Sequence, residues 1–162
     1  MEKSRFYQLA IEWINAETKR LDDFCEALDK DPMEKNGKIT EYKCAKYRYA
    51  GVVNVWYALY NSYRTADRNA EKHYLMPQLN DIFIATPEYV TFYDNAPDDE
   101  KRDYALYYGV IAFTDSKLAE LEAKLPLATD WEKIELEERI GGLHFAKECL
   151  DEAWQKRKDV IQ

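Results

Sequence analysis

The chain has 162 residues and a net charge of -8, because 31 acidic residues outnumber 23 lysines and arginines. Its 46% content of hydrophobic residues excludes intrinsic disorder, and its 5 Gly and 5 Pro are too few for a many-stranded all-β fold. A usual domain size of roughly 100–200 residues predicts one helical domain over residues 1–162, and no apolar run approaches the roughly 18 residues of a membrane span.

The first two helices are predicted from apolar residues at helical spacing. The first helix spans about residues 4–29. Its apolar stripe is Phe6, Leu9, Trp13, Leu21, Phe24 and Leu28. Residues 31–37 contain an Asp-Pro and an Asn-Gly pair, so a turn-rich loop is predicted there. Thr40 is predicted to cap the second helix, which runs to about Arg68.

The connection over about residues 71–96 is open to two interpretations. Residues 81–85 and 89–93 have the composition of two strands that would pair as a hairpin. Thr86-Pro87-Glu88 is also a good helix start, with Thr as the cap and Pro at the first helical position. We favour short helical pieces, because the segments on both sides are helical.

Two further long helices are predicted in the second half of the chain. The third spans about residues 97–125 and begins with acidic residues, which suit the positive end of a helix dipole. Thr129 and Glu132 form a capping-box motif that opens the last helix. Gly141 and Gly142 interrupt this helix, and we favour a kink or a break there over a close approach by a neighbouring helix.

Four long helices with one apolar face each bury those faces most simply against one another. The connections between the first and second helices and between the third and fourth are short, so each pair should form an antiparallel hairpin. We therefore predict an all-α fold, a bundle of four long antiparallel helices with a shorter crossover element at about residues 71–96.

Residues with the spacing of a catalytic or metal site are scarce. A di-iron carboxylate bundle needs inward Glu-x-x-His pairs, but the residues three positions before His73 and His144 are Ala70 and Gly141. The sequence contains no Cys-x-x-Cys zinc motif, no glycine-rich phosphate loop and no Gly-x-Ser-x-Gly nucleophile motif. We predict no catalytic residues, no metal and no cofactor, and hence a protein that is not an enzyme.

The cysteines bear on location and on reactivity. Three cysteines at unpatterned spacing argue against a disulfide framework and for a reducing, cytoplasmic setting. Cys44 lies beside Lys43 and Lys46 near the start of the second helix, an environment that would stabilise a reactive thiolate. We favour the interpretation that Cys44 is a small packing residue.

The second helix is basic and rich in tyrosine within an acidic chain. Residues 40–70 hold five basic and two acidic residues, a net charge of +3, and six tyrosines lie between residues 42 and 63. Tyrosine beside arginine is enriched at protein interfaces, so a partner-binding surface is predicted at Tyr47, Arg48, Tyr57 and Arg64. Two alternatives are that the outward tyrosines pack under the crossover, or that they stack single-stranded nucleic acid, which the surrounding negative charge disfavours.

A second candidate surface is acidic and lies on the third and fourth helices. Carboxylates three or four positions apart on a helix stand about 5–6 Å apart, which is near the spacing of backbone phosphates. Such a face would imitate nucleic acid, although a solvated face that keeps the protein soluble is the simpler interpretation. The candidate residues are Asp98, Asp99, Glu100, Asp103, Glu148, Asp151 and Glu152.

These observations lead to three functional hypotheses. The first is a non-catalytic protein-binding protein, an adaptor or inhibitor, that acts through the Tyr/Arg-rich helix on another protein or on a second copy of itself. The second is an acidic nucleic-acid mimic that blocks a basic nucleic-acid-binding protein. In size and charge, though in no motif, the chain is similar to the anti-CRISPR inhibitors of phage counter-defence. The third is a small enzyme whose site has no recognisable motif.

Overall fold

A computed structural model describes residues 4–68 and 98–159. This part of the chain is helical throughout its regular structure, which confirms the predicted all-α bundle. The elements are α1 (Arg5–Asp29), α2 (Pro32–Gly37), α3 (Ile39–Arg68), α6 (Asp98–Lys124), the 3-10 turn η1 (Leu125–Leu127) and α7 (Asp130–Lys156). The predicted crossover at about residues 71–96 lies outside the described residues.

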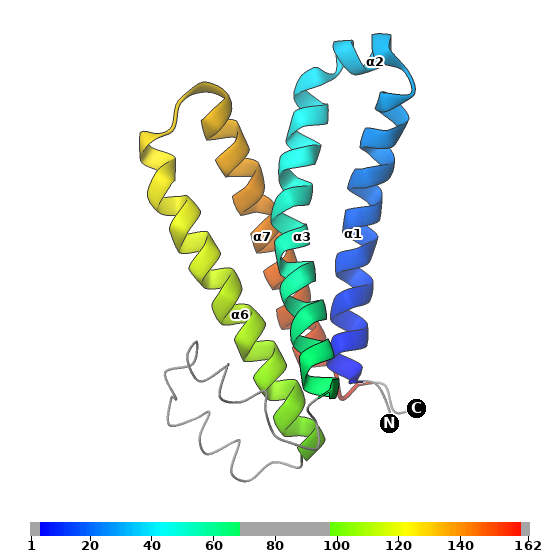
Figure 1. Ribbon diagram of the computed structural model, residues 1–162, viewed down its shortest axis with the longest axis vertical. Helices are drawn as coiled ribbons and strands as arrows, with labels where there is room; N and C mark the ends of the chain where they lie inside the picture. Colours follow the sequence, from blue (N-terminus) through cyan, green and yellow to red (C-terminus); the bar gives the residue numbers. More distant parts are fainter. Residues whose placement is uncertain (1–3, 69–97, 160–162) are drawn as a thin grey trace.

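Two antiparallel hairpins make up the bundle (Figure 1). The α1–α3 hairpin turns through α2, and the α6–α7 hairpin turns through η1. Helices α3 and α7 run in the same direction and pack against each other, while α1 and α6 flank them (Figure 1). The core therefore lies between all four long helices, and its largest fully buried side chains are Phe6, Ile14, Leu59, Leu106, Leu143 and Leu150.

The first connection is more ordered than its turn residues predict. Asp31 caps α2, because its side chain accepts a hydrogen bond from the Glu34 backbone N–H at 3.2 Å and Pro32 occupies the first helical position. Helix α3 begins earlier than predicted, with the Tyr42 N–H donating to the Lys38 carbonyl at 2.9 Å. Thr40 consequently lies inside α3 and does not cap it, so that prediction is wrong.

The capping box predicted at the start of α7 is also absent. The Thr129 side chain makes no capping hydrogen bond to the first turn. The next residue, Asp130, has a φ of 54°, in the left-handed region that a non-glycine residue rarely adopts. A capping box needs helical geometry at that position, so the backbone turn at Asp130 separates Thr129 from Glu132.

Glycines allow the two central helices to touch. A Cβ built on Gly142 would overlap the Arg48 carbonyl oxygen and stand 3.0 Å from the Val52 nitrogen. A Cβ on Gly51 would overlap the Arg139 carbonyl oxygen in the same way. Helix α7 is continuous from Asp130 to Lys156, so the predicted break into two shorter helices is wrong. The structure shows the alternative, a close approach between α7 and the neighbouring helix α3.

Candidate functional site

The edge of α3 beside α1 carries stacked aromatic rings ending in an arginine. The Trp56 and Tyr60 rings stack with centroids 4.9 Å apart, and Tyr57 meets Trp56 edge-on at 5.0 Å. The Arg64 guanidinium carbon lies 5.3 Å from the Tyr60 ring centroid, within the range of a cation–π contact. We call Trp56, Tyr57, Tyr60 and Arg64 the aromatic row. Its Tyr57 side is open to solvent, with 55% of the residue exposed.

Contacts with α1 hold the aromatic row in place. The Trp56 Nε1–H donates to the Asn15 side-chain oxygen. The Tyr7 and Tyr63 rings stack with centroids 3.8 Å apart. Burial, together with the nearby hydroxyls of Tyr60 and Tyr63, raises the pKa of Tyr7 above its ordinary value. The rings on this side of α3 thus have defined orientations before any partner binds.

The structure divides the four predicted partner-binding residues. Tyr57 and Arg64 belong to the aromatic row, and Tyr47 is half-buried. Arg48 is elsewhere, because its side chain is only 29% exposed and its Nη2 lies 3.3 Å from Glu17 Oε2 on α1. Its guanidinium carbon also lies 5.5 Å from the Phe145 ring centroid on α7. Arg48 therefore joins three helices.

Glu17 is the residue that sequence reasoning missed at this junction. Its side chain is 7% exposed, and Arg20 Nε donates to Glu17 Oε1 at 2.5 Å. Burial alone would raise the pKa of Glu17, but hydrogen bonds and charges from Arg20 and Arg48 outweigh it and lower the pKa below the ordinary value. A signal was available, since Glu17 stands three residues after Ile14 and four before Leu21, in the buried stripe of α1.

The lowered pKa of Glu17 gives a pH prediction. A carboxyl whose pKa falls on folding stabilises the protein above its unfolded pKa, and that contribution is lost as the pH falls through the folded pKa. The difference in unfolding free energy between the wild type and Glu17→Gln should be constant above a pH of about 5 and shrink below about 4. Urea denaturation at a series of pH values measures it. A difference that stays constant from about pH 6 to about pH 3 would contradict this account.

Two acidic residues of the second candidate surface have basic neighbours. Glu100 Oε1 lies 3.5 Å from Lys158 Nζ, and Glu152 Oε1 lies 2.6 Å from Lys156 Nζ. Asp151 accepts a hydrogen bond from the Tyr107 hydroxyl at 2.6 Å, which ties α7 to α6. The two lysines weaken the local negative field. The other predicted members are Glu148, which is exposed, Asp103, which is half-buried, and Asp98 and Asp99, which lie in the first turn of α6.

The cysteines have no activated thiol. Burial, with smaller contributions from Glu138 and Glu41, raises the pKa of Cys44 above the ordinary value. Burial also raises the pKa of Cys25, and it raises that of Cys149 to about 11. A raised pKa disfavours the thiolate, which is the nucleophilic form. These shifts argue against the thiolate interpretation of Cys44.

The histidine within the described residues has an exposed ionic neighbour. His144 Nε2 lies 3.6 Å from Glu122 Oε1 on α6, so its contact crosses between helices. Across residues 4–68 and 98–159, no three His, Cys, Asp or Glu side chains are grouped as a metal site would need.

None of the described helices combines the length and the apolar character that crossing a membrane requires. No protein-family model matches the chain, and neither curated proteins nor solved structures give a significant match to it.

Proposed function

We propose that this protein is a non-catalytic protein-binding protein, an adaptor or inhibitor, whose partner docks on the aromatic row of α3. The observation that carries the proposal is the exposed Tyr57 and Arg64 at the edges of the fixed Trp56–Tyr60 stack. Tryptophan, tyrosine and arginine are the residue types enriched among those that dominate binding energy at interfaces. The cysteine pattern supports a reducing, cytoplasmic setting for this activity.

Preorganisation is the physical reason why this surface suits a partner. Immobilising a rotamer-rich side chain at an interface costs about 0.5–1.5 kcal/mol. The contact of Trp56 with Asn15 and its stacking on Tyr60 already order this side chain in the folded protein, so less entropy is lost when a partner binds. Residues 42–66 contain no acidic side chain, so the surface suits an acidic or neutral partner. The acidic residues of α6 and α7, by contrast, are partly matched by Lys156 and Lys158.

Paired variants test the proposal against the nucleic-acid-mimic alternative. A partner would be captured from the host cell by affinity purification and its dissociation constant measured with purified components. The variant Tyr57→Ala/Arg64→Ala should weaken binding by about 30-fold or more, since a single hot-spot truncation costs about 2 kcal/mol. The variant Asp98→Asn/Asp99→Asn/Glu100→Gln should bind like the wild type.

Two controls complete this experiment. Phe24→Ala/Lys30→Ala also removes one partly exposed aromatic and one exposed base, but from the C-terminal end of α1 and its cap, and should leave binding unchanged. Light scattering of the wild type and the Tyr57→Ala/Arg64→Ala variant identifies a second copy of the chain as the partner if only the wild type self-associates. Loss of binding in the acidic variant with retention in the Tyr57 and Arg64 variant would overturn the proposal.

A further inference from the structure

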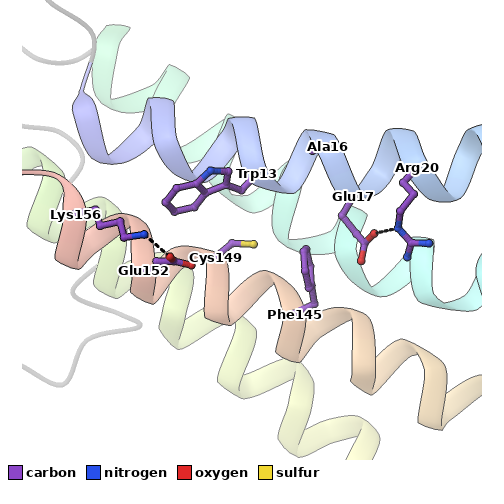
Figure 2. A pocket seen from close by; sticks show the side chains of 8 residues that line it. All are labelled: Trp13, Ala16, Glu17, Arg20, Phe145, Cys149, Glu152 and Lys156. Atoms are coloured by element: carbon purple, nitrogen blue, oxygen red, sulfur yellow. Dashed lines mark hydrogen bonds and ion pairs between the residues drawn. The ribbon is translucent and has the colours of Figure 1, made fainter. Parts of the chain in front are cut away.

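A groove with a volume of about 520 Å³ lies between α1 and α7 (Figure 2). Its size falls within the roughly 300–1,000 Å³ typical of ligand pockets. The lining residues are Trp13, Ala16, Glu17 and Arg20 from α1, and Phe145, Cys149, Glu152 and Lys156 from α7. The aromatic row is not part of it.

The middle of the groove is apolar. The Trp13 and Phe145 side chains point into the space between the two helices, and the Cys149 thiol lies between them (Figure 2). Both aromatic residues are half-buried and Cys149 is 7% exposed. The raised pKa of Cys149 keeps its thiol neutral near neutral pH. This stretch therefore favours a hydrocarbon or aromatic body over a polar one.

The two ends of the groove differ in charge. At one end, Lys156 and Glu152 form a one-to-one ion pair at 2.6 Å. At the other end, two guanidinium groups, Arg20 and Arg48, share the single carboxylate of Glu17. This cluster of three side chains carries one excess positive charge, although Arg48 lies behind the lining. Glu148, which acts on Cys149 from the same helix, adds a negative charge near the middle of the groove.

Arg20 is the arginine that can reach a ligand. Its side chain is 64% exposed, and within the described part of the chain its ion pair with Glu17 uses only Nε. The two terminal nitrogens of its guanidinium therefore keep their donors for another acceptor. A carboxylate is the small acceptor that matches a guanidinium best, because it takes two parallel N–H···O bonds.

We propose that this groove binds an amphipathic carboxylic acid, with an alkyl or aryl body lying between Trp13 and Phe145 and a carboxylate at Arg20. The apolar floor supplies affinity through burial of the body. The excess positive charge at one end selects the head group and sets the orientation.

Calorimetry with three ten-carbon probes, below their micelle concentrations, tests head-group selection on the full-length protein. Decanoate should bind the wild type at least 10-fold more tightly than decanol, and decylamine more weakly still. Equal binding of all three probes, or no binding of decanoate, would overturn the proposal.

Matched charge variants test the placement of the carboxylate. Arg20→Gln should weaken decanoate binding at least 10-fold, while Lys19→Gln, which removes the same charge from the adjacent exposed residue, should not. Equal decanoate affinity in Arg20→Gln and Lys19→Gln would contradict the assignment, with a thermal melt confirming that both fold.

A separate variant tests whether decanoate binds in this groove or at the aromatic row. Tyr57→Ala/Arg64→Ala should bind decanoate like the wild type, because neither residue lines the groove. If that variant loses decanoate binding while Arg20→Gln keeps it, the acid binds at the aromatic row and the groove assignment is wrong.

Discussion

Replacing Gly142 with alanine is expected to lower the free energy of unfolding by about 2–3 kcal/mol, the upper part of the usual range for overpacking. The new Cβ would overlap the Arg48 carbonyl oxygen, which belongs to the α3 backbone and cannot rotate away. Alanine also favours the helix by about 1 kcal/mol over glycine, so the steric cost must exceed that gain. Gly51→Ala should behave alike, since its Cβ would meet the Arg139 carbonyl oxygen on α7.

Two other glycines supply matched controls for this measurement. A Cβ on Gly141 would stand 3.3 Å from Arg48 Nη1, at the movable end of a long side chain, and a Cβ on Gly37 would meet nothing within 4 Å. Gly141→Ala should therefore change stability by less than about 1 kcal/mol, and Gly37→Ala should be neutral or slightly stabilising. Urea denaturation compares all four variants. If Gly142→Ala were as stable as Gly141→Ala, α3 and α7 would not be in backbone contact.

Arg48→Ala is expected to lower the free energy of unfolding by about 2–3 kcal/mol. It removes a hydrogen-bonded charge from the buried Glu17, where such bonds contribute about 1.5–3 kcal/mol, and it removes the side chain that packs over Phe145. Glu17 keeps Arg20, so the carboxylate is not left wholly unpaired. That remaining contact keeps the cost below the roughly 3–5 kcal/mol of breaking an isolated buried pair.

Arg20→Ala is the matched control for Arg48→Ala. Both arginines contact the same carboxylate, but Arg20 is 64% exposed and Arg48 is 29% exposed. The Arg20 substitution should therefore cost about 1 kcal/mol or less. A double-mutant cycle of Arg48→Ala with Glu17→Gln, measured by urea denaturation, should give a coupling of about 1–2 kcal/mol. Coupling near zero would show that Arg48 contributes through packing alone.

Local sequence signals were sufficient to locate the long helices. The apolar periodicity of α1 predicted residues 4–29, and the helix runs Arg5–Asp29. The same signals were less decisive at a helix start and at the edge of an apolar stripe. Asp31-Pro32 suits either a turn or a helix start, and Asp31 caps α2. Phe24 fits the α1 stripe by spacing but is 37% exposed, because Cys25 faces the core there.

The consequence of the glycine pair could not be predicted from α7 alone. Glycine lowers the stability of a helix by the same amount whether or not another backbone lies opposite it. The sequence of α7 by itself therefore favoured a break at the glycine pair. What decides the outcome is the α3 backbone opposite Gly142, over 90 residues away in the chain. The stabilising contact is visible only in the packed structure.

The candidate surface was predicted in part. Tyr57 falls off the core stripe of α3, and it is exposed as that spacing predicts. Trp56 is half-buried and packs against the core, whereas Val52, Val55 and Leu59 are fully buried. Arg48 resembles Arg64 in sequence context but extends to Glu17, a partner 31 positions away that periodicity along α3 does not reveal.

The salt dependence of partner binding tests the central claim, that recognition occurs through the aromatic row, most directly. The dissociation constant of the captured partner would be measured from about 0.05 to about 0.5 M NaCl, over which the Debye length falls by about threefold. Recognition through buried aromatic rings with one arginine predicts that the affinity changes by less than about 10-fold across this range. A steep loss of affinity with salt, abolished in Asp98→Asn/Asp99→Asn/Glu100→Gln, would contradict the claim and identify the acidic surface as the site of recognition.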